Sequence, residues 1–454
     1  MQNERFRIAI VGSGIGGLTF ALSLHELCQD IRVDIYESTA SFTEIGAGIG
    51  LWPRPWEIMQ ALGLESDLLS ISDTSGSLER WVQFIYRKSD QAEGVTFCEG
   101  RQRVRFKPLH RADFQAILSK RLPDSWDVHF SKRLSSYDVT RTGEISLRFT
   151  DASTATCDLL VGCDGLKSAV RMGLYSTLSQ QAQAAGDDVG AARLRSMSTP
   201  MWTGSVAYRG LVPRTALEEV DPTHPALTDA LMYFGKDKHL LTFPVSQGRV
   251  INVVAFFSQP ELEGTAYDGP WVRQVTKDEL LADFASWESQ VRSLLGCLDK
   301  VSLWAIHSLP SLPTYVGNRV ALLGDAAHAM TPHQGSGAGQ AAEDAFVLAN
   351  IIAHPAVTME TLPDALRVYD EIRRPFSQEI VERSRQTGLI YDLVSPALPH
   401  ITEEASASGE IPSEILEEAG RMVVDLTSWL GSTSIMDDRD KALAMLNALL
   451  NTEH

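Results

Sequence analysis

The sequence lacks any hydrophobic run near the roughly 18 apolar residues that a membrane helix needs, and its mean hydropathy is −0.08. Positive charge is also in short supply, because 40 Lys and Arg stand against 58 Asp and Glu, a formal net charge of −18. We therefore expect no membrane span and no nucleic-acid partner, since polyanions bind to basic surfaces. The charged start, MQNERFRIAIV, leads directly into a strand-like run and indicates no secretory signal.

The cysteines are few and unpaired in pattern, with no Cys-x-x-Cys spacing: Cys28, Cys98, Cys157, Cys163 and Cys297. An odd, scattered set excludes a disulfide framework and indicates reduced thiols, so we expect a cytoplasmic protein. His328 and His333 have no carboxylate at ligand spacing, and we expect no metal site.

The length of 454 residues predicts two or three domains. The chain opens with an apolar run at 6–11, a glycine-rich turn, a helical pattern and a second strand pattern at 32–36. Such a strand–helix–strand unit is typical of the parallel sheet of a layered α/β domain.

The turn carries the dinucleotide fingerprint Gly12-x-Gly14-x-x-Gly17. Gly12 permits the tight turn, Gly14 lets the backbone approach a pyrophosphate, and Gly17 lets the helix pack on the strand. Glu37, twenty residues beyond Gly17, ends the second strand and can bind the two ribose hydroxyls. The fingerprint predicts a dinucleotide site and leaves NAD and FAD as alternatives.

The segments 76–104 and 200–300 have a different pattern, with strand-like runs separated by short turns such as GKDK and SQG. Short turns join antiparallel strands, so we expect an antiparallel sheet inserted between pieces of the first domain. The stretch 178–198, rich in Ala, Gln, Gly and Asp, is interpreted as a mobile surface excursion. From about 360 onward helical patterns dominate.

Two later segments extend the fingerprint. VGCDG at 161–165 and LGDAAH at 323–328, in this order, resemble the further motifs of the group A, single-component FAD-dependent aromatic monooxygenases, and the resemblance spans about 1–385. It implies an α/β fold: a Rossmann-like FAD-binding domain of the p-hydroxybenzoate hydroxylase type, an interleaved antiparallel-sheet substrate domain and a helical C-terminal region. The domains expected are 1–75, 105–178 and 301–385 for FAD, 76–104 and 199–300 for the substrate, and 386–454 for the C-terminal region.

The resemblance also assigns cofactor residues. Asp325 is expected to bind the ribityl chain, and a small-residue segment opening a helix is expected beside the flavin ring, where a helix N-terminus stabilises negative charge. The full set predicted to bind FAD, beyond the fingerprint and Glu37, is Gly48, Arg111, Asp164, Asp325, Pro332, Gly337 and Ala338. The contact of Arg54, which departs from the family pattern, stays open between flavin, substrate and solvent.

One fingerprint without a second indicates that NADH or NADPH only visits, while FAD is tightly bound. The resemblance, nearest to the salicylate hydroxylase-like and 4-hydroxybenzoate 1-hydroxylase-like branch, implies that O2 forms a C4a-hydroperoxyflavin that hydroxylates a small phenolic acid. It favours decarboxylating attack on 4-hydroxybenzoate, protocatechuate, vanillate or salicylate. Hydroxylation or dearomatisation of a polyketide phenol, a flavin dehydrogenase or oxidase, and a non-catalytic FAD-binding scaffold remain alternatives, as do monomer and homodimer.

Substrate residues are expected on the inserted sheet. Arg209 is a charged residue in mid-strand and predicts an anion site for carboxylate or phenolate. His239 resembles the histidine of a family His-x-x-x-Tyr-Pro segment whose tyrosine is here Phe243, so Tyr233 is the candidate to replace that tyrosine. An aromatic box for a planar ring could use Trp52, Trp56, Trp202, Phe234 and Phe243.

Overall fold

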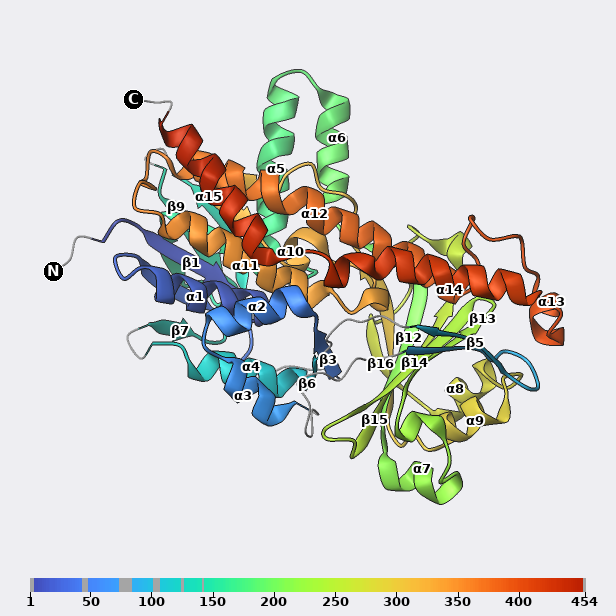
Figure 1. Ribbon diagram of the computed structural model, residues 1–454. Helices are drawn as coiled ribbons and strands as arrows, with labels where there is room; N and C mark the ends of the chain where they lie inside the picture. The colour runs from blue at the N-terminus through green and yellow to red at the C-terminus, as the bar shows by residue number, and fades with distance from the viewer. Residues whose placement is uncertain are drawn as a thin grey trace.

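The computed structural model describes residues 4–42, 48–72, 84–100, 107–123, 126–140 and 143–451. One part of the molecule is built on a six-stranded sheet (Figure 1) in the order β18-β19-β11-β1-β2-β7, parallel except that β18 runs antiparallel to β19. Its strands are β1 (Arg7–Val11), β2 (Arg32–Tyr36), β7 (Asp127–His129), β11 (Leu159–Gly162), β18 (Val316–Gly317) and β19 (Val320–Leu322). With α1 (Ile15–Leu27) between β1 and β2, the expected βαβ unit is confirmed.

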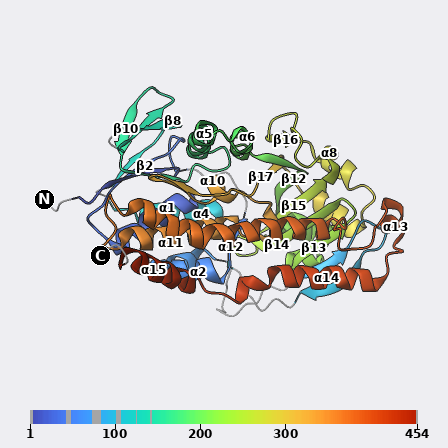
Figure 2. The ribbon, with the colours of Figure 1, turned by 90° about the horizontal axis from the view of Figure 1, so that it is seen from above.

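Helices cover this sheet and share one hydrophobic core with it. The small and apolar residues of α11 are buried almost along its whole length, which lets it pack closely against α1. Seen from above, α12 runs lengthwise across both parts of the molecule (Figure 2). The helices of this layer are α2 (Pro53–Ala61), α3 (Glu65–Ile71), α4 (Arg111–Lys120), α10 (Asp325–His328), α11 (Gly337–Ala353), α12 (Leu362–Tyr391) and α15 (Ile435–Asn451).

The second part is an eight-stranded sheet in the order β16-β17-β12-β15-β14-β13-β4-β5. The pairs β12 with β15, β15 with β14, and β14 with β13 are antiparallel, as the short turns predict. In contrast, β13 and β4 run parallel. The strands are β4 (Phe84–Lys88), β5 (Val95–Gly100), β12 (Met201–Pro213), β13 (Ala230–Gly235), β14 (Lys238–Val245), β15 (Val250–Ser258), β16 (Val272–Val275) and β17 (Val301–Ser308).

The two faces of the large sheet have different neighbours. One face packs against α7 (Arg214–Val220), α8 (Lys277–Asp283) and α9 (Ser289–Gly296). The other packs against the end of α12 and against α14 (Ser413–Thr427), and turns toward the first part. Smaller elements are β3 (Gly48–Leu51) with β6 (Lys107–His110), the sheet of β8 (Leu134–Val139), β9 (Ile145–Phe149) and β10 (Thr154–Cys157), α13 (Glu403–Ser408), and the 3-10 turns η1 (Pro225–Leu227), η2 (Pro260–Leu262), η3 (Pro332–Gln334) and η4 (Ser428–Gly431).

As predicted, the stretch 178–198 is a surface excursion, but it is helical. Two helices, α5 (Ala169–Ala184) and α6 (Asp188–Met197), form a hairpin there that projects from the body (Figure 1). The Ala and Gln that suggested disorder are good helix formers. Both helices are capped, because the Ser168 side chain accepts a hydrogen bond from Arg171 N and that of Asp187 from Gly190 N.

The expected domain boundaries stay a prediction, with one visible difference: β17 places residues 301–308 in the large sheet rather than with the nucleotide-binding part. The C-terminal region does not stand apart, since α14 packs on β5 and α15 packs on α11 and α2. The five cysteines are free thiols. Within the described ranges, no helix has the length and apolar character needed to cross a membrane.

Arg54 contacts neither the cavity described below nor solvent. It is 1 % exposed, and its guanidinium pairs with Glu343 of α11 at 2.9 Å and with Asp438 of α15 at 2.5 Å. Arg373 of α12 pairs with Glu343 at 3.1 Å and completes the cluster. Buried charges are tolerated only when they are paired, so this cluster ties α15 to the nucleotide-binding part.

Replacing Arg54 by Leu should therefore lower the free energy of unfolding by about 3 kcal/mol, because Glu343 and Asp438 lose a buried partner. Urea unfolding of the purified protein measures this loss. Arg148→Leu is the control, since Arg148 pairs with Asp138 on the exposed surface, where such a pair contributes little. Equal stability of the two variants would contradict the structural role of the cluster.

Candidate active site

A cavity of about 610 Å³ lies where the carboxyl ends of the parallel strands face the large sheet. Ligands of open α/β sheets bind at this edge. The predicted cofactor residues converge on it although they come from distant segments: Gly12, Gly14, Glu37, Gly48, Arg111, Asp164, Asp325, Pro332, Gly337 and Ala338 all line the cavity. Residues 46 and 47, which precede the predicted Gly48, lie outside the described residues.

The glycine turn leaves no room for side chains. Gly12 has φ +101°, and a Cβ there would lie 2.3 Å from the carbonyl oxygen of Cys163. A Cβ on Gly17, which does not line the cavity, would lie 2.1 Å from the carbonyl oxygen of Gly12. The turn thus brings the N-terminus of α1 to the cavity, where its free N–H groups can bind a pyrophosphate.

Gly12→Val should yield protein with little or no bound FAD, because the side chain must displace the backbone at Cys163. Flavin absorbance per chain after purification, with circular dichroism to check folding, measures the effect. Gly296→Ala is the control, since a Cβ at Gly296 meets nothing within 4 Å. A Gly12 variant that keeps a full complement of FAD would contradict the assignment.

Glu37 has the position and charge expected for a ribose-binding acid. One carboxylate oxygen accepts hydrogen bonds from Ser13 N at 2.9 Å and Ser13 Oγ at 2.7 Å, and the other accepts one from Thr39 N at 2.8 Å. Burial alone would raise the pKa of Glu37, but the bonds from Ser13 and Thr39 outweigh it and lower that pKa. The carboxylate is therefore ionised at neutral pH, suited to ribose hydroxyls and repulsive to a 2′-phosphate.

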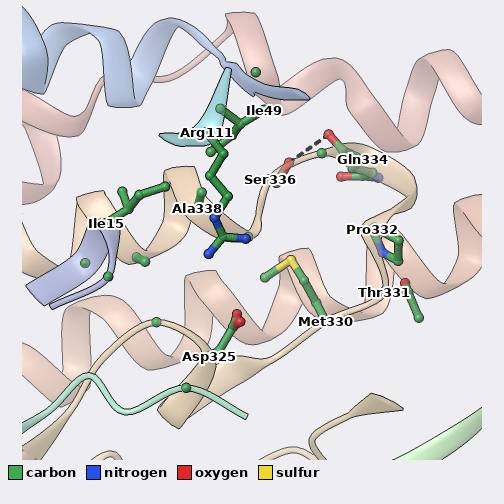
Figure 3. A pocket seen from close by; sticks show the side chains of 18 of the residues that line it. Ile15, Ile49, Arg111, Asp325, Met330, Thr331, Pro332, Gln334, Ser336 and Ala338 are labelled. Atoms are coloured by element: carbon green, nitrogen blue, oxygen red, sulfur yellow. Dashed lines mark hydrogen bonds between the residues drawn. The ribbon is translucent and has the colours of Figure 1, made fainter. Parts of the chain in front are cut away.

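The two motif aspartates differ. Asp325 is exposed at the start of α10, and Figure 3 shows it and Arg111 reaching into the cavity from opposite sides. Asp164 lines the cavity, but its carboxylate caps α5, accepting hydrogen bonds from Ser168 Oγ at 2.5 Å and Ala169 N at 2.7 Å. Its capping bonds use both oxygens, so Asp164 shapes the turn beside the cavity.

The turn expected beside the flavin ring contains Gln334, and hydrogen bonds between Gln334 and other segments hold the turn in place. Trp52 Nε1 donates to the Gln334 carbonyl at 3.1 Å, as does the Ser336 hydroxyl (Figure 3). The Gln334 side chain accepts from Trp429 Nε1 at 3.1 Å and donates to Thr387 Oγ1 at 3.0 Å. The C-terminal region thus fixes this turn, which sequence reasoning missed because Trp429 carries no recognisable motif.

Arg209 faces the cavity from β12, together with Ala207, while Tyr208 between them faces away. Its guanidinium lies over the Trp304 ring at 5.3 Å, and its Nε has no hydrogen-bond partner among the described residues. Burial, and then the charge of Arg111, lower the pKa of Arg209. A half-buried cation beside a second arginine, without an acidic partner among the described residues, can bind an anion.

His239 is fully buried on β14 and lines the cavity. Its Nδ1 bonds to Asp392 Oδ1 at 2.6 Å, its ring stacks on Phe256, and its Nε2 has no partner among the described residues. His333 lies edge-on at 5.0 Å between ring centroids. Burial, and then the electrostatic effect of the neighbouring His239, hold the pKa of His333 well below its usual value.

The prediction that Tyr233 lies beside the substrate is wrong. Side chains alternate along β13, so Met232 lines the cavity while Tyr233 is buried on the other face, in the core with α8 and α9. The predicted aromatic box is only partly present. Trp52 and Phe243 line the cavity, whereas Trp56, Trp202 and Phe234 do not.

The described residues that could jointly hold a metal ion are Asp34, Asp127 and His129, on β2 and β7, none of which lines the cavity. His328, whose spacing predicts no metal site, bonds to Asp344 at 2.5 Å and is fully buried.

The family profile described as "FAD binding domain" matches residues 5–384. The chain is 38 % identical over 411 residues to salicylate hydroxylase of Pseudomonas putida, covering 88 % of this chain and 89 % of that protein. This chain belongs to the FAD-dependent aromatic monooxygenases. FAD is the cofactor of this enzyme, and NAD(P)H and O2 are the usual co-substrates of its class.

Further relatives place the monooxygenase in the same group. It is 31 % identical over 392 residues to 6-methylsalicylate 1-monooxygenase of Aspergillus terreus, covering 84 % of this chain and 82 % of that protein. A solved salicylate hydroxylase substrate complex matches with a TM-score of 0.80 and 31 % identity, over 97 % of this chain and 98 % of that one. The resemblance inferred from the sequence motifs, and the p-hydroxybenzoate hydroxylase type of fold, are confirmed.

Proposed function

We propose that this monooxygenase hydroxylates a small phenolic acid at the carbon that bears the carboxylate, with salicylate as the leading substrate. Salicylate, NAD(P)H, O2 and two protons would give catechol, CO2, NAD(P)⁺ and water. One C–O bond forms at the ring carbon whose bond to the carboxylate breaks, and NAD(P)H supplies the two electrons.

The observation that carries this proposal is the pairing of two groups in one cavity: the unneutralised Arg209 and the Asp392-bonded His239. A guanidinium matches the geometry of a carboxylate. An imidazole whose Nδ1 is held by a carboxylate presents its Nε2 as a proton acceptor. An ortho-hydroxybenzoate carries a carboxylate for Arg209 and a phenolic hydroxyl for His239.

Different residues of the chain bind the substrate, accept its proton and exclude water. Arg209 binds and orients the carboxylate, and His239 Nε2 takes the phenol proton, which makes the ring more electron-rich. Asp392 fixes the tautomer of His239. Around the ring, Met232, Leu241, Val254 and Phe256 provide apolar walls that exclude water. FAD, when bound, supplies the activated oxygen.

The relatives whose names include salicylate support an ortho-hydroxybenzoate over 4-hydroxybenzoate, protocatechuate or vanillate. Loss of the carboxylate as CO2 and a cytoplasmic location belong to the same proposal; the five free thiols support the location.

The test is oxidation of NADH and of NADPH by the purified holoenzyme, with and without salicylate, together with peroxide and product analysis. We expect salicylate to stimulate oxidation and catechol to form. Stimulated oxidation that yields only peroxide would indicate an oxidase. No stimulation by salicylate or the other acids, but oxygenation of a larger carboxylate-free phenol, would favour the polyketide reading.

A further inference from the structure

Asn252 is a cavity residue that the proposed reaction leaves unused. It lies on β15, lines the cavity and is 2 % exposed. Its Oδ1 has no hydrogen-bond partner among the described residues. A buried amide oxygen without a partner costs free energy, so Asn252 can accept a hydrogen bond from a ligand group in the cavity.

The register of the sheet places Asn252 relative to the two proposed substrate contacts. Asn252 lies opposite Leu211 on β12. This pair is two residues along the strands from the pair of Arg209 with Val254, on the same face of the sheet. The Cα atoms of such diagonal neighbours are about 7–8 Å apart. On the other side, His239 of β14 lies opposite Phe256, two side-chain steps along β15 from Asn252 on the same face. Along the strand direction, Arg209 therefore lies between His239 and Asn252.

We propose that Asn252 binds a second ring hydroxyl, on the side of the carboxylate opposite to the hydroxyl that His239 deprotonates. This inference rests on the proposed function. Along the strand direction, the order His239, Arg209, Asn252 matches the order hydroxyl, carboxylate, hydroxyl on the ring, which favours 2,6-dihydroxybenzoates among the ortho-hydroxybenzoates of the proposed function. A hydroxyl both donates and accepts, and an amide offers both complementary atoms.

Thr242, on the neighbouring strand β14, does not compete for this role. Thr242 Oγ1 also lacks a partner among the described residues, but Thr242 is opposite Leu231 and Val253 on the face that packs against the helices, and it does not line the cavity. Thr242 is therefore a matched control: it is buried, unpartnered and one strand away, yet it is on the wrong face.

The test measures dissociation constants of the FAD-loaded enzyme for salicylate, 2,6-dihydroxybenzoate and 2,3-dihydroxybenzoate from their perturbation of the flavin spectrum. The wild-type enzyme should bind the 2,6-isomer more tightly than salicylate and the 2,3-isomer. Asn252→Leu, close in volume, should reduce the preference for the 2,6-isomer over salicylate about 3- to 10-fold, the effect of one neutral hydrogen bond. Thr242→Val should leave that preference as in the wild type.

An unchanged preference in Asn252→Leu would overturn the inference, and so would loss of FAD from this variant, because Asn252 would then serve the flavin or the fold. The two proposals fail separately. If none of the three acids is oxygenated but the binding preference depends on Asn252, the proposed reaction fails and the hydroxyl site stands. If salicylate is converted to catechol and the preference is indifferent to Asn252, the reaction stands and the hydroxyl site fails.

Discussion

Asp392→Asn should lower kcat/KM for salicylate about 100-fold while FAD stays bound. Asp392 acts through His239, to which it bonds at 2.6 Å, and it is a positioning residue that selects the tautomer with a proton on Nδ1 and a free Nε2. An amide can instead donate to Nδ1 and select the opposite tautomer, which cannot accept the phenol proton at Nε2. Positioned general bases contribute about 10²–10⁴-fold, so the loss is expected at the lower end. Steady-state kinetics with product quantification measures it.

A merely structural role for Asp392 would lower turnover of all substrates alike. In our account the defect is smaller for a fluorinated salicylate, because its more acidic phenol depends less on a base. Asp283→Asn is the control, since Asp283 accepts a bond from the Tyr208 hydroxyl at 2.6 Å on the opposite face of the same sheet. An Asp392 variant with unchanged kcat/KM, or with equal defects for both substrates, would contradict the base assignment.

Arg209→Leu should weaken salicylate binding about 100-fold, as expected when a buried charge pair loses one partner. The same change should have little effect on a phenol without a carboxylate, so the discrimination between the two should disappear. Binding titrations on the FAD-loaded enzyme measure both. Arg209 lines the cavity, and its Nε has no hydrogen-bond partner among the described residues.

Arg273→Leu is the matched control, because Arg273 lies on β16 of the same sheet and pairs with Glu279 at the surface. It should bind salicylate as the wild type does. Undiminished salicylate affinity in Arg209→Leu would remove Arg209 from the anion site and leave Arg111 as the cavity cation to examine next.

The cofactor side of the site could be predicted because its signals are local in the sequence. Gly12, Gly14 and Gly17 fulfil backbone requirements within six residues, and Glu37 follows at the spacing of one βαβ unit. Their convergence on one cavity then follows from the parallel sheet, whose carboxyl ends meet at one edge. Arg209 was found because a charge in an apolar strand is itself a signal.

The substrate side could be predicted only in part. Asp392 lies 153 residues from His239 along the chain, in a region without a motif, and only the packing of the end of α12 on the sheet brings them together. The prediction for Tyr233 is wrong because the sequence does not say which alternate residues of β13 face the cavity, and a shift of one residue reverses the face. Asn252 gave no signal, because one polar residue in a strand is unremarkable until its partners are known.

The central claim is that oxygen enters at the carboxyl-bearing carbon. It is tested most directly by mass spectrometry of the products formed from salicylate labelled with ¹³C in the carboxylate, under ¹⁸O2. Our account predicts catechol carrying one ¹⁸O atom, and ¹³CO2 in equal amount to the NAD(P)H consumed. A dihydroxybenzoate that retains the ¹³C label, or peroxide without an oxygenated product, would contradict it.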